Sequence, residues 1–186
     1  MAEFQSFEPG VEVVGEVVAA FVGGFPSGTQ KMGLIILERH GIKDPGPGKF
    51  FPLQNFLDAM KEISDSLGPQ ILTRIGEEIS ANAILPPDLD SLEKCLESID
   101  IAYHMNHRGG EIGHYNYSYE GIQGGLHRAK MVCPNCYPCA FDRGVIEGFA
   151  QRFKPEDAIG IEVRHDDEEP CRRKGADSCT YIVSWV

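Results

Sequence analysis

Two groups of cysteines near the C-terminus are the feature that most constrains this chain. Cys133, Cys136 and Cys139 form a C-x2-C-x2-C run, and Cys171 and Cys179 follow with seven residues between them. Each group falls at a turn between predicted elements, where thiolates can converge without the constraints of a helix or a strand ladder. Two such turns can supply the four soft ligands of a tetrahedral zinc site. An iron–sulfur cluster stays open as an alternative, because C-x2-C-x2-C spacing also occurs in ferredoxins.

The acidic composition excludes some classes of partner. The 186 residues carry 17 basic and 28 acidic side chains and a net charge of −11. Nucleic acids and anionic membrane surfaces attract basic proteins, so neither is an expected partner. No stretch approaches the roughly 20 apolar residues that span a bilayer, and no secretory signal begins the chain. The sequence therefore predicts a cytoplasmic protein, in which reduced thiols favour a metal over disulfides.

Hydrophobic periodicity divides the chain into two parts of one domain, residues 1–186. Residues 1–110 are mainly helical, with apolar residues at helical spacing in three segments that Gly-Pro and Pro-Pro pairs separate. The valine-rich segment 11–22 could form either a strand or a helix. Residues 111–186 alternate between apolar and polar side chains in two strand pairs around one helix. This layout predicts an α+β fold with an antiparallel sheet that helices cover on one side.

The spacing of cysteines and glycines resembles that of the 4-vinyl reductase domain family. The residues that carry the resemblance are Cys139-x4-Gly144-x3-Gly148 and Glu168-x2-Cys171-x3-Gly175-x3-Cys179. The resemblance implies a small-molecule-binding fold similar to subunits of the TRAPP trafficking complex. It also implies an apolar, aromatic or hydrocarbon-like ligand, a homodimer, and a signalling or enzyme partner on a separate chain.

The same resemblance implies a set of metal ligands. Zinc in the sensor members of that family corresponds here to four residues: Cys139, Glu168, Cys171 and Cys179. Cys133 and Cys136 are additional thiols and serve as alternate ligands. If Cys136 replaces Glu168, the site becomes an all-cysteine site, which also keeps the iron–sulfur alternative open.

Aromatic residues in the second half could line an apolar pocket. The candidates are Tyr115, Tyr117, Phe141 and Phe149. Ordinary core packing is the alternative for all four, because aromatic side chains dominate protein cores in general. His104 and His107 have a spacing that could bind a metal on a helix, but the glycines that follow favour a polar loop.

No sequence motif indicates catalysis. Nucleophile-elbow, phosphate-loop and HExxH patterns are absent from the sequence. The leading hypothesis is a non-enzymatic sensor or carrier domain with a structural zinc ion. An iron–sulfur or thiol redox protein and a protein-interaction module are the two alternatives.

Overall fold

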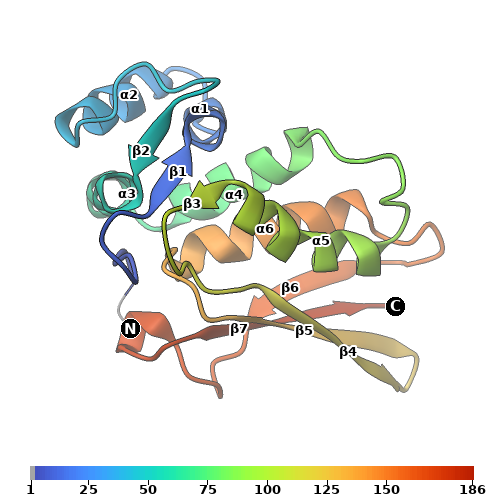
Figure 1. The fold of residues 1–186 in the computed structure, drawn as a ribbon. Helices are drawn as coiled ribbons and strands as arrows, with labels where there is room; N and C mark the ends of the chain where they lie inside the picture. The colour runs from blue at the N-terminus through green and yellow to red at the C-terminus, as the bar shows by residue number, and fades with distance from the viewer. Residues whose placement is uncertain (1–2) are drawn as a thin grey trace.

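A four-stranded antiparallel sheet supports a stack of helices on one of its faces (Figure 1). A computed structural model describes residues 3–186. The strand order is β4-β5-β7-β6, with the bounds β4 (Asn116–Gln123), β5 (Leu126–Cys133), β6 (Ile161–His165) and β7 (Cys179–Trp185). The register pairs Cys133 of β5 with Cys179 of β7, so the sheet brings the two cysteine groups to the same end.

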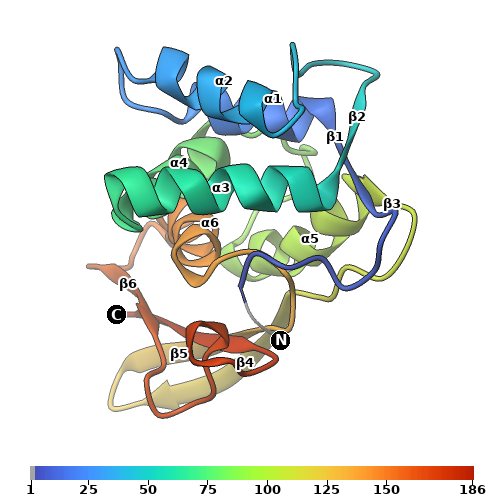
Figure 2. The same cartoon turned by 90° about the vertical axis from the view of Figure 1, so that its left-hand side faces the viewer.

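The helices form successive layers above this sheet (Figure 2). Their bounds are α1 (Gly15–Gly23), α2 (Gln30–Arg39), α3 (Leu53–Leu67), α4 (Gln70–Asn82), α5 (Leu92–Met105) and α6 (Cys139–Arg152). Helices α5 and α6 lie next to the sheet, α3 and α4 lie above them, and α1 and α2 lie farthest away. Helix α3 buries one apolar stripe, as a 3.6-residue period requires, whereas α6 packs against α4 on one side and against β6 on the other.

A second, small sheet ties distant parts of the chain together. Its order is β2-β1-β3, with β1 (Glu12–Val14), β2 (Phe50–Pro52) and β3 (His107–Arg108). These strands have only two or three residues, which is too short for a period-two pattern to be recognised in the sequence. The valine-rich segment that could have been a strand or a helix is both, because β1 runs directly into α1.

Helices α4 and α6 approach each other through glycine. A Cβ atom added to Gly144 of α6 would lie 1.9 Å from the carbonyl oxygen of Thr73 in α4. One added to Gly76 of α4 would lie 2.7 Å from the carbonyl oxygen of Phe141. Real side chains do not tolerate such distances, so only glycine allows these two backbones to touch. As a result, the first turn of α4 lies beside the first turn of α6.

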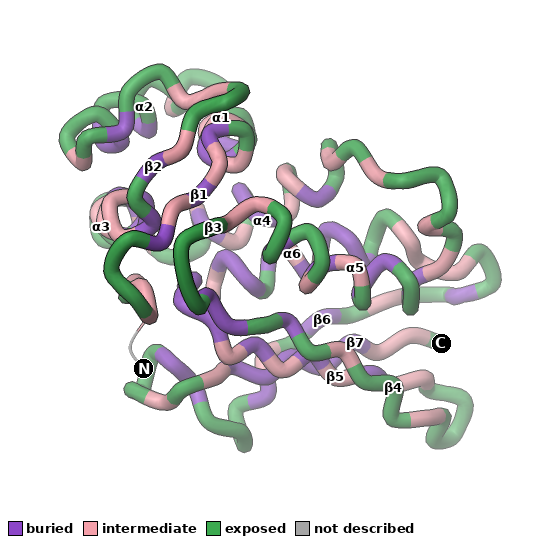
Figure 3. Tube along the Cα trace, viewed as in Figure 1, coloured by how far each residue is buried: buried purple, intermediate pink, exposed green. Residues whose placement is uncertain are grey.

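The predicted fold class is confirmed. Helices dominate the first half, and the second half forms an antiparallel sheet with α6 between its strand pairs. The segment that joins β5 to α6 is almost entirely buried (Figure 3). Within residues 3–186, no helix is both long enough and apolar enough to cross a membrane.

Candidate metal centre

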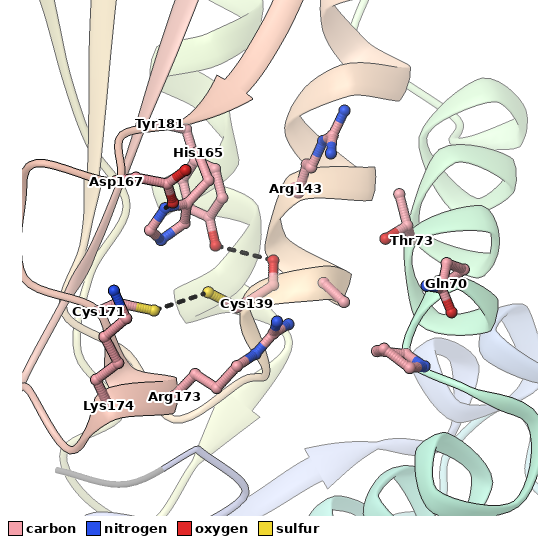
Figure 4. A pocket seen from close by; sticks show the side chains of 12 residues that line it. Gln70, Thr73, Cys139, Arg143, His165, Asp167, Cys171, Arg173, Lys174 and Tyr181 are labelled. Atoms are coloured by element: carbon pink, nitrogen blue, oxygen red, sulfur yellow. Dashed lines mark hydrogen bonds and ion pairs between the residues drawn. The ribbon is translucent and has the colours of Figure 1, made fainter.

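Three thiols from distant parts of the chain meet at the end of the sheet. Cys139 is the first residue of α6, Cys179 is the first residue of β7, and Cys171 precedes the 3-10 helix η1 (Arg172–Lys174). The sulfur of Cys139 lies 3.0 Å from that of Cys179. It lies 3.6 Å from the sulfur of Cys171, as the dashed line in Figure 4 marks. All three cysteines are buried and none forms a disulfide. The fold thus brings three of the predicted ligands together, while metal binding by them stays a prediction.

His165 supplies a fourth ligand atom to this group. One ligand atom from each of Cys139, His165, Cys171 and Cys179 lies within 4.8 Å of the others. The Nδ1 atom of His165 lies 3.1 Å from a carboxylate oxygen of Asp167, while its Nε2 atom is buried without a hydrogen-bond partner in the described chain. A buried nitrogen without a partner is costly unless something else binds it. A carboxylate that orients the ring from its other nitrogen is the usual support of a metal-binding histidine.

The charge around Cys179 favours a thiolate. The pKa of Cys179 lies well below the ordinary value for cysteine, because the Cys139 thiol and Arg172 donate hydrogen bonds to its sulfur and the positive charge of Arg172 attracts the thiolate. Burial acts in the opposite direction and raises this pKa. The backbone nitrogen and Nε of Arg172 donate to that sulfur at 3.4 and 3.5 Å. Thiolate is the form of cysteine that binds metals, so Cys179 can bind a cation directly, whereas Cys139, whose pKa is raised by the hydrogen bond to Cys179 and by burial, must first release a proton.

A buried ion pair holds Arg172 in place behind the thiols. The guanidinium group of Arg172 contacts the carboxylate of Asp142, and both side chains are fully buried. Arg172 also donates to the carbonyl oxygen of Asn135 at 2.5 Å, and the Tyr115 hydroxyl donates to Asp142 at 2.5 Å. Burial raises the pKa of Asp142 to about 6, although Arg172 and Tyr115 oppose that shift. This network fixes the cation that stabilises the Cys179 thiolate.

A groove of about 280 Å³ leads to the thiols (Figure 4). The first turns of α4 and α6 form one wall, and the segment between β6 and β7 forms the other. Three cationic side chains lie along it, those of Arg143, Arg173 and Lys174. Cys139 and Cys171 are 5% and 8% exposed at its floor, so a metal ion can reach them from solvent.

Three other predicted metal ligands lie outside the four-residue group. Glu168 is exposed in the connection between β6 and β7. Cys133 is buried in β5, and the sulfur of Cys136 lies 3.6 Å from the hydroxyl of Tyr103. The prediction did not include His165. Its signal was the alternation of Ile161 and Val163, which continues to His165 on the inner face of β6.

The four predicted pocket residues lie away from the groove. Tyr115 is buried and bonded to Asp142, and the ring of Phe141 lies 6.2 Å from that of Phe21 in the core. Phe149 is also buried, whereas Tyr117 is half-buried. Their contacts are those of core packing, and ligand binding by these residues stays a prediction.

Comparisons with known proteins identify the fold. No protein-family model and no curated protein matches the chain. Solved structures do match: an H-NOX protein from S. oneidensis in the Fe(II)NO ligation state has a TM-score of 0.64 and 16% identity, over 93% of this chain and 99% of that one. An oxygen-binding H-NOX domain related to soluble guanylate cyclases has a TM-score of 0.57 and 15% identity, over 92% and 93% of the two chains. The chain has the H-NOX fold.

This match corrects the family resemblance. The similarity to the 4-vinyl reductase domain and to TRAPP subunits is wrong, and so are the hydrocarbon-binding and trafficking-module functions that it implied. The reason is physical: the spacing of cysteines and glycines describes local turns and one helix contact, which unrelated folds can share. Zinc and an iron–sulfur cluster were wrong as cofactors of this fold, because the solved neighbours are heme-iron proteins. The thiol redox alternative gains no support from them either.

Proposed function

We propose that this chain is a regulatory sensor domain built on the H-NOX fold. The observation that carries the proposal is the length of the match, which spans 93% of this chain and 99% of the S. oneidensis protein. The whole architecture is thus shared, rather than a single motif. The neighbours are described with bound NO and O2, so sensing is the function that the fold suggests. A cytoplasmic location, a homodimer and a signalling partner on a separate chain belong to this proposal.

Heme is the group that the fold implies, and the histidines of this chain do not fit it. Heme iron is held by a histidine, cysteine, methionine or tyrosine that faces the porphyrin pocket. His107, the histidine nearest the interior of the helices, has both ring nitrogens occupied: Nδ1 donates to the Tyr103 carbonyl at 2.7 Å, and Nε2 lies 2.9 Å from the Tyr137 hydroxyl. His165 belongs to the group of thiols. The remaining histidines bond to polar groups or stack at the surface, namely His40, His104, His114 and His127.

Aromatic side chains also occupy the interior between the layers. The rings of Phe21 and Phe56 lie 5.1 Å apart, those of Tyr103 and Tyr137 lie 5.9 Å apart, and those of Tyr137 and Phe141 lie 5.4 Å apart. These rings connect α1 and α3 with α5 and α6. A porphyrin between the layers would have to displace them, and the rings would lose their close-packed contacts.

Neither the groove at the thiols nor a wider hollow over α4 and α6 has the character of a heme pocket. Pockets for ligands of this size enclose about 300–1,000 Å³ and are mostly apolar. The groove at the thiols is about 280 Å³ and cationic, and a wider hollow over α4 and α6 is lined by charged side chains that include Glu77, Glu147 and Arg152. The residues of this chain therefore do not fit heme, and the proposed function does not depend on it.

The four-residue group is the site that we propose receives the signal. Three thiols, one thiolate-stabilising arginine and one histidine with an unpartnered Nε2 atom favour a transition-metal ion with thiolate and imidazole ligands. An ion on Cys139, Cys171, Cys179 and His165 would join the start of α6 to the β6–β7 connection. Its binding or loss would then alter the contact of α6 with α4, which is the route from the sheet to the outer helices.

Titration of the full chain tests this proposal in two arms. Hemin is added in the first arm and Co²⁺, as a spectroscopic probe, in the second. We expect no stoichiometric Soret absorption with hemin, under conditions in which the S. oneidensis H-NOX protein binds heme. We expect one Co²⁺ per chain with sulfur-to-metal charge-transfer absorption, and altered hydrogen exchange in α4 and α6 on loading.

Matched variants test whether His165 or Glu168, the residue that the sequence predicted, binds the metal ion. His165→Gln should weaken Co²⁺ binding by at least about tenfold and change its spectrum, because a ligand is lost. Glu168→Gln should leave both unchanged, since Glu168 is exposed and outside the group. Stoichiometric heme binding would overturn the heme-free proposal, and Co²⁺ binding that is insensitive to His165→Gln would overturn the assigned ligands.

A further inference from the structure

A second group of side chains that could hold a metal ion lies where α5 meets the loop before β4. One ligand atom from each of Asp100, His104 and His114 lies within 4.8 Å of the others. Asp100 and His104 are one turn apart on α5, and His114 comes from the loop before β4. The side chains are 31%, 41% and 50% exposed, so an ion can reach them from solvent.

Hydrogen bonds orient two of these side chains. The Nδ1 atom of His104 lies 2.9 Å from the carbonyl oxygen of Asp100, which can only accept a hydrogen bond. Nδ1 therefore carries the proton of neutral His104, and an ion bound at this atom, which lies 3.6 Å from a carboxylate oxygen of Asp100, would replace that hydrogen bond. One carboxylate oxygen of Asp100 accepts a hydrogen bond from the backbone nitrogen of Tyr115 at 2.8 Å. The bond from Tyr115 holds the Asp100 carboxylate in place, as supporting hydrogen bonds do for metal ligands.

The loop that presents His114 is held rigidly. The backbone nitrogen of His114 donates to the carbonyl oxygen of Pro134 at 3.0 Å. Gly113 has a φ of +84°, and a Cβ atom there would lie 1.9 Å from the same carbonyl oxygen. The rings of His104 and His114 have centroids 4.9 Å apart. Two imidazolium cations at that distance would repel each other, whereas two neutral imidazoles could share one cation.

We propose that Asp100, His104 and His114 bind a divalent first-row transition-metal ion. Two imidazoles and one carboxylate suit such ions, and three protein ligands leave positions for water. The ion would link α5 to the loop before β4, and would thereby connect the helical layers to the sheet. This site uses none of the residues of the four-residue group at the thiols, so it does not depend on the proposed function.

Titration with Ni²⁺ tests this second site in the full chain. The double variant His104→Gln/His114→Gln should bind one Ni²⁺ fewer per chain than the wild type, measured by calorimetry and by metal analysis after dialysis. Asp100→Asn should bind it at least about tenfold more weakly, because the charged ligand is lost. An asparagine oxygen can still accept the Tyr115 hydrogen bond, so the loop should remain in place.

Matched controls make the result decisive. His127→Gln removes another surface histidine, which stacks on Trp185, and should leave Ni²⁺ binding unchanged. All variants retain the four-residue group of Cys139, His165, Cys171 and Cys179. Any Ni²⁺ bound there is therefore the same in every variant and does not affect the difference. Ni²⁺ should also raise the urea midpoint of the wild type more than that of the double variant. Equal stoichiometry in the wild type and in a folded double variant would overturn the proposal.

Discussion

At the scale of the residue, burial decides how His107 titrates. Burial lowers the pKa of His107 to about 4, although the hydrogen bond to the Tyr103 carbonyl opposes this shift. An unfolded histidine titrates near 6.5, so between these values the unfolded chain binds a proton that the folded chain does not bind. The stability that neutral His107 contributes is therefore present above about pH 6.5 and is lost as the pH falls toward 4.

The variant His107→Gln should remove this pH dependence. We expect the wild type to lose about 2 kcal/mol more of its free energy of unfolding than the variant between pH 7.5 and pH 4.5, after a discount for the partial exposure of the ring. Urea unfolding of both proteins at the two pH values measures the difference. The glutamine can still bond to Tyr137, so folding should survive, and equal losses in both proteins would contradict the assignment.

At the scale of the element, the crossing of α4 and α6 depends on glycine. Gly144→Ala should lower the free energy of unfolding by about 1–3 kcal/mol, because the new methyl group would meet a backbone oxygen that cannot rotate away. Alanine gains roughly 1 kcal/mol of helix propensity over glycine, which is too little to offset the clash. Thermal or urea unfolding measures the change.

Gly160→Ala is the matched control for this substitution. A Cβ atom at Gly160 would have no heavy atom within 4 Å, and its backbone does not require positive φ. We expect a change within about 0.5 kcal/mol, as for other surface positions. If Gly144→Ala proved as mild as Gly160→Ala, the close approach of the two helices would be wrong.

At the scale of the whole molecule, shared packing should make the layers unfold together. Aromatic rings join α1, α3 and α5 to the segment before α6. The buried hydroxyl of Tyr181 in β7 donates to the carbonyl oxygen of Cys139 in α6 at 2.9 Å, so the sheet is packed directly against the helical layers. Trp185, the only tryptophan, lies in β7 and reports the sheet, whereas far-UV circular dichroism reports mainly the helices. We expect the same urea midpoint from both probes. Two separate midpoints would show that the helical and sheet parts are independent domains.

Local patterns in the sequence were sufficient for the elements and the fold class. Helical and alternating periods marked most helices and the strands of the large sheet, and the two cysteine groups marked the turns where thiols meet. The sequence did not predict the small sheet, because its strands are too short to show a period. They also pair residues up to 96 positions apart, as in the Glu12–Arg108 contact. The family resemblance failed for a related reason, since its motif described only local turns.

The sequence by itself determined the α+β class, the acidic surface and the cysteines that converge. Only the tertiary structure decided that His165 rather than Glu168 joins them, that His104 faces His114, and that aromatic rings fill the interior. The physical reason is that period and spacing are properties of neighbours along the chain. A site, in contrast, is made by residues that only packing brings together, such as Cys139 and Cys179, 40 positions apart.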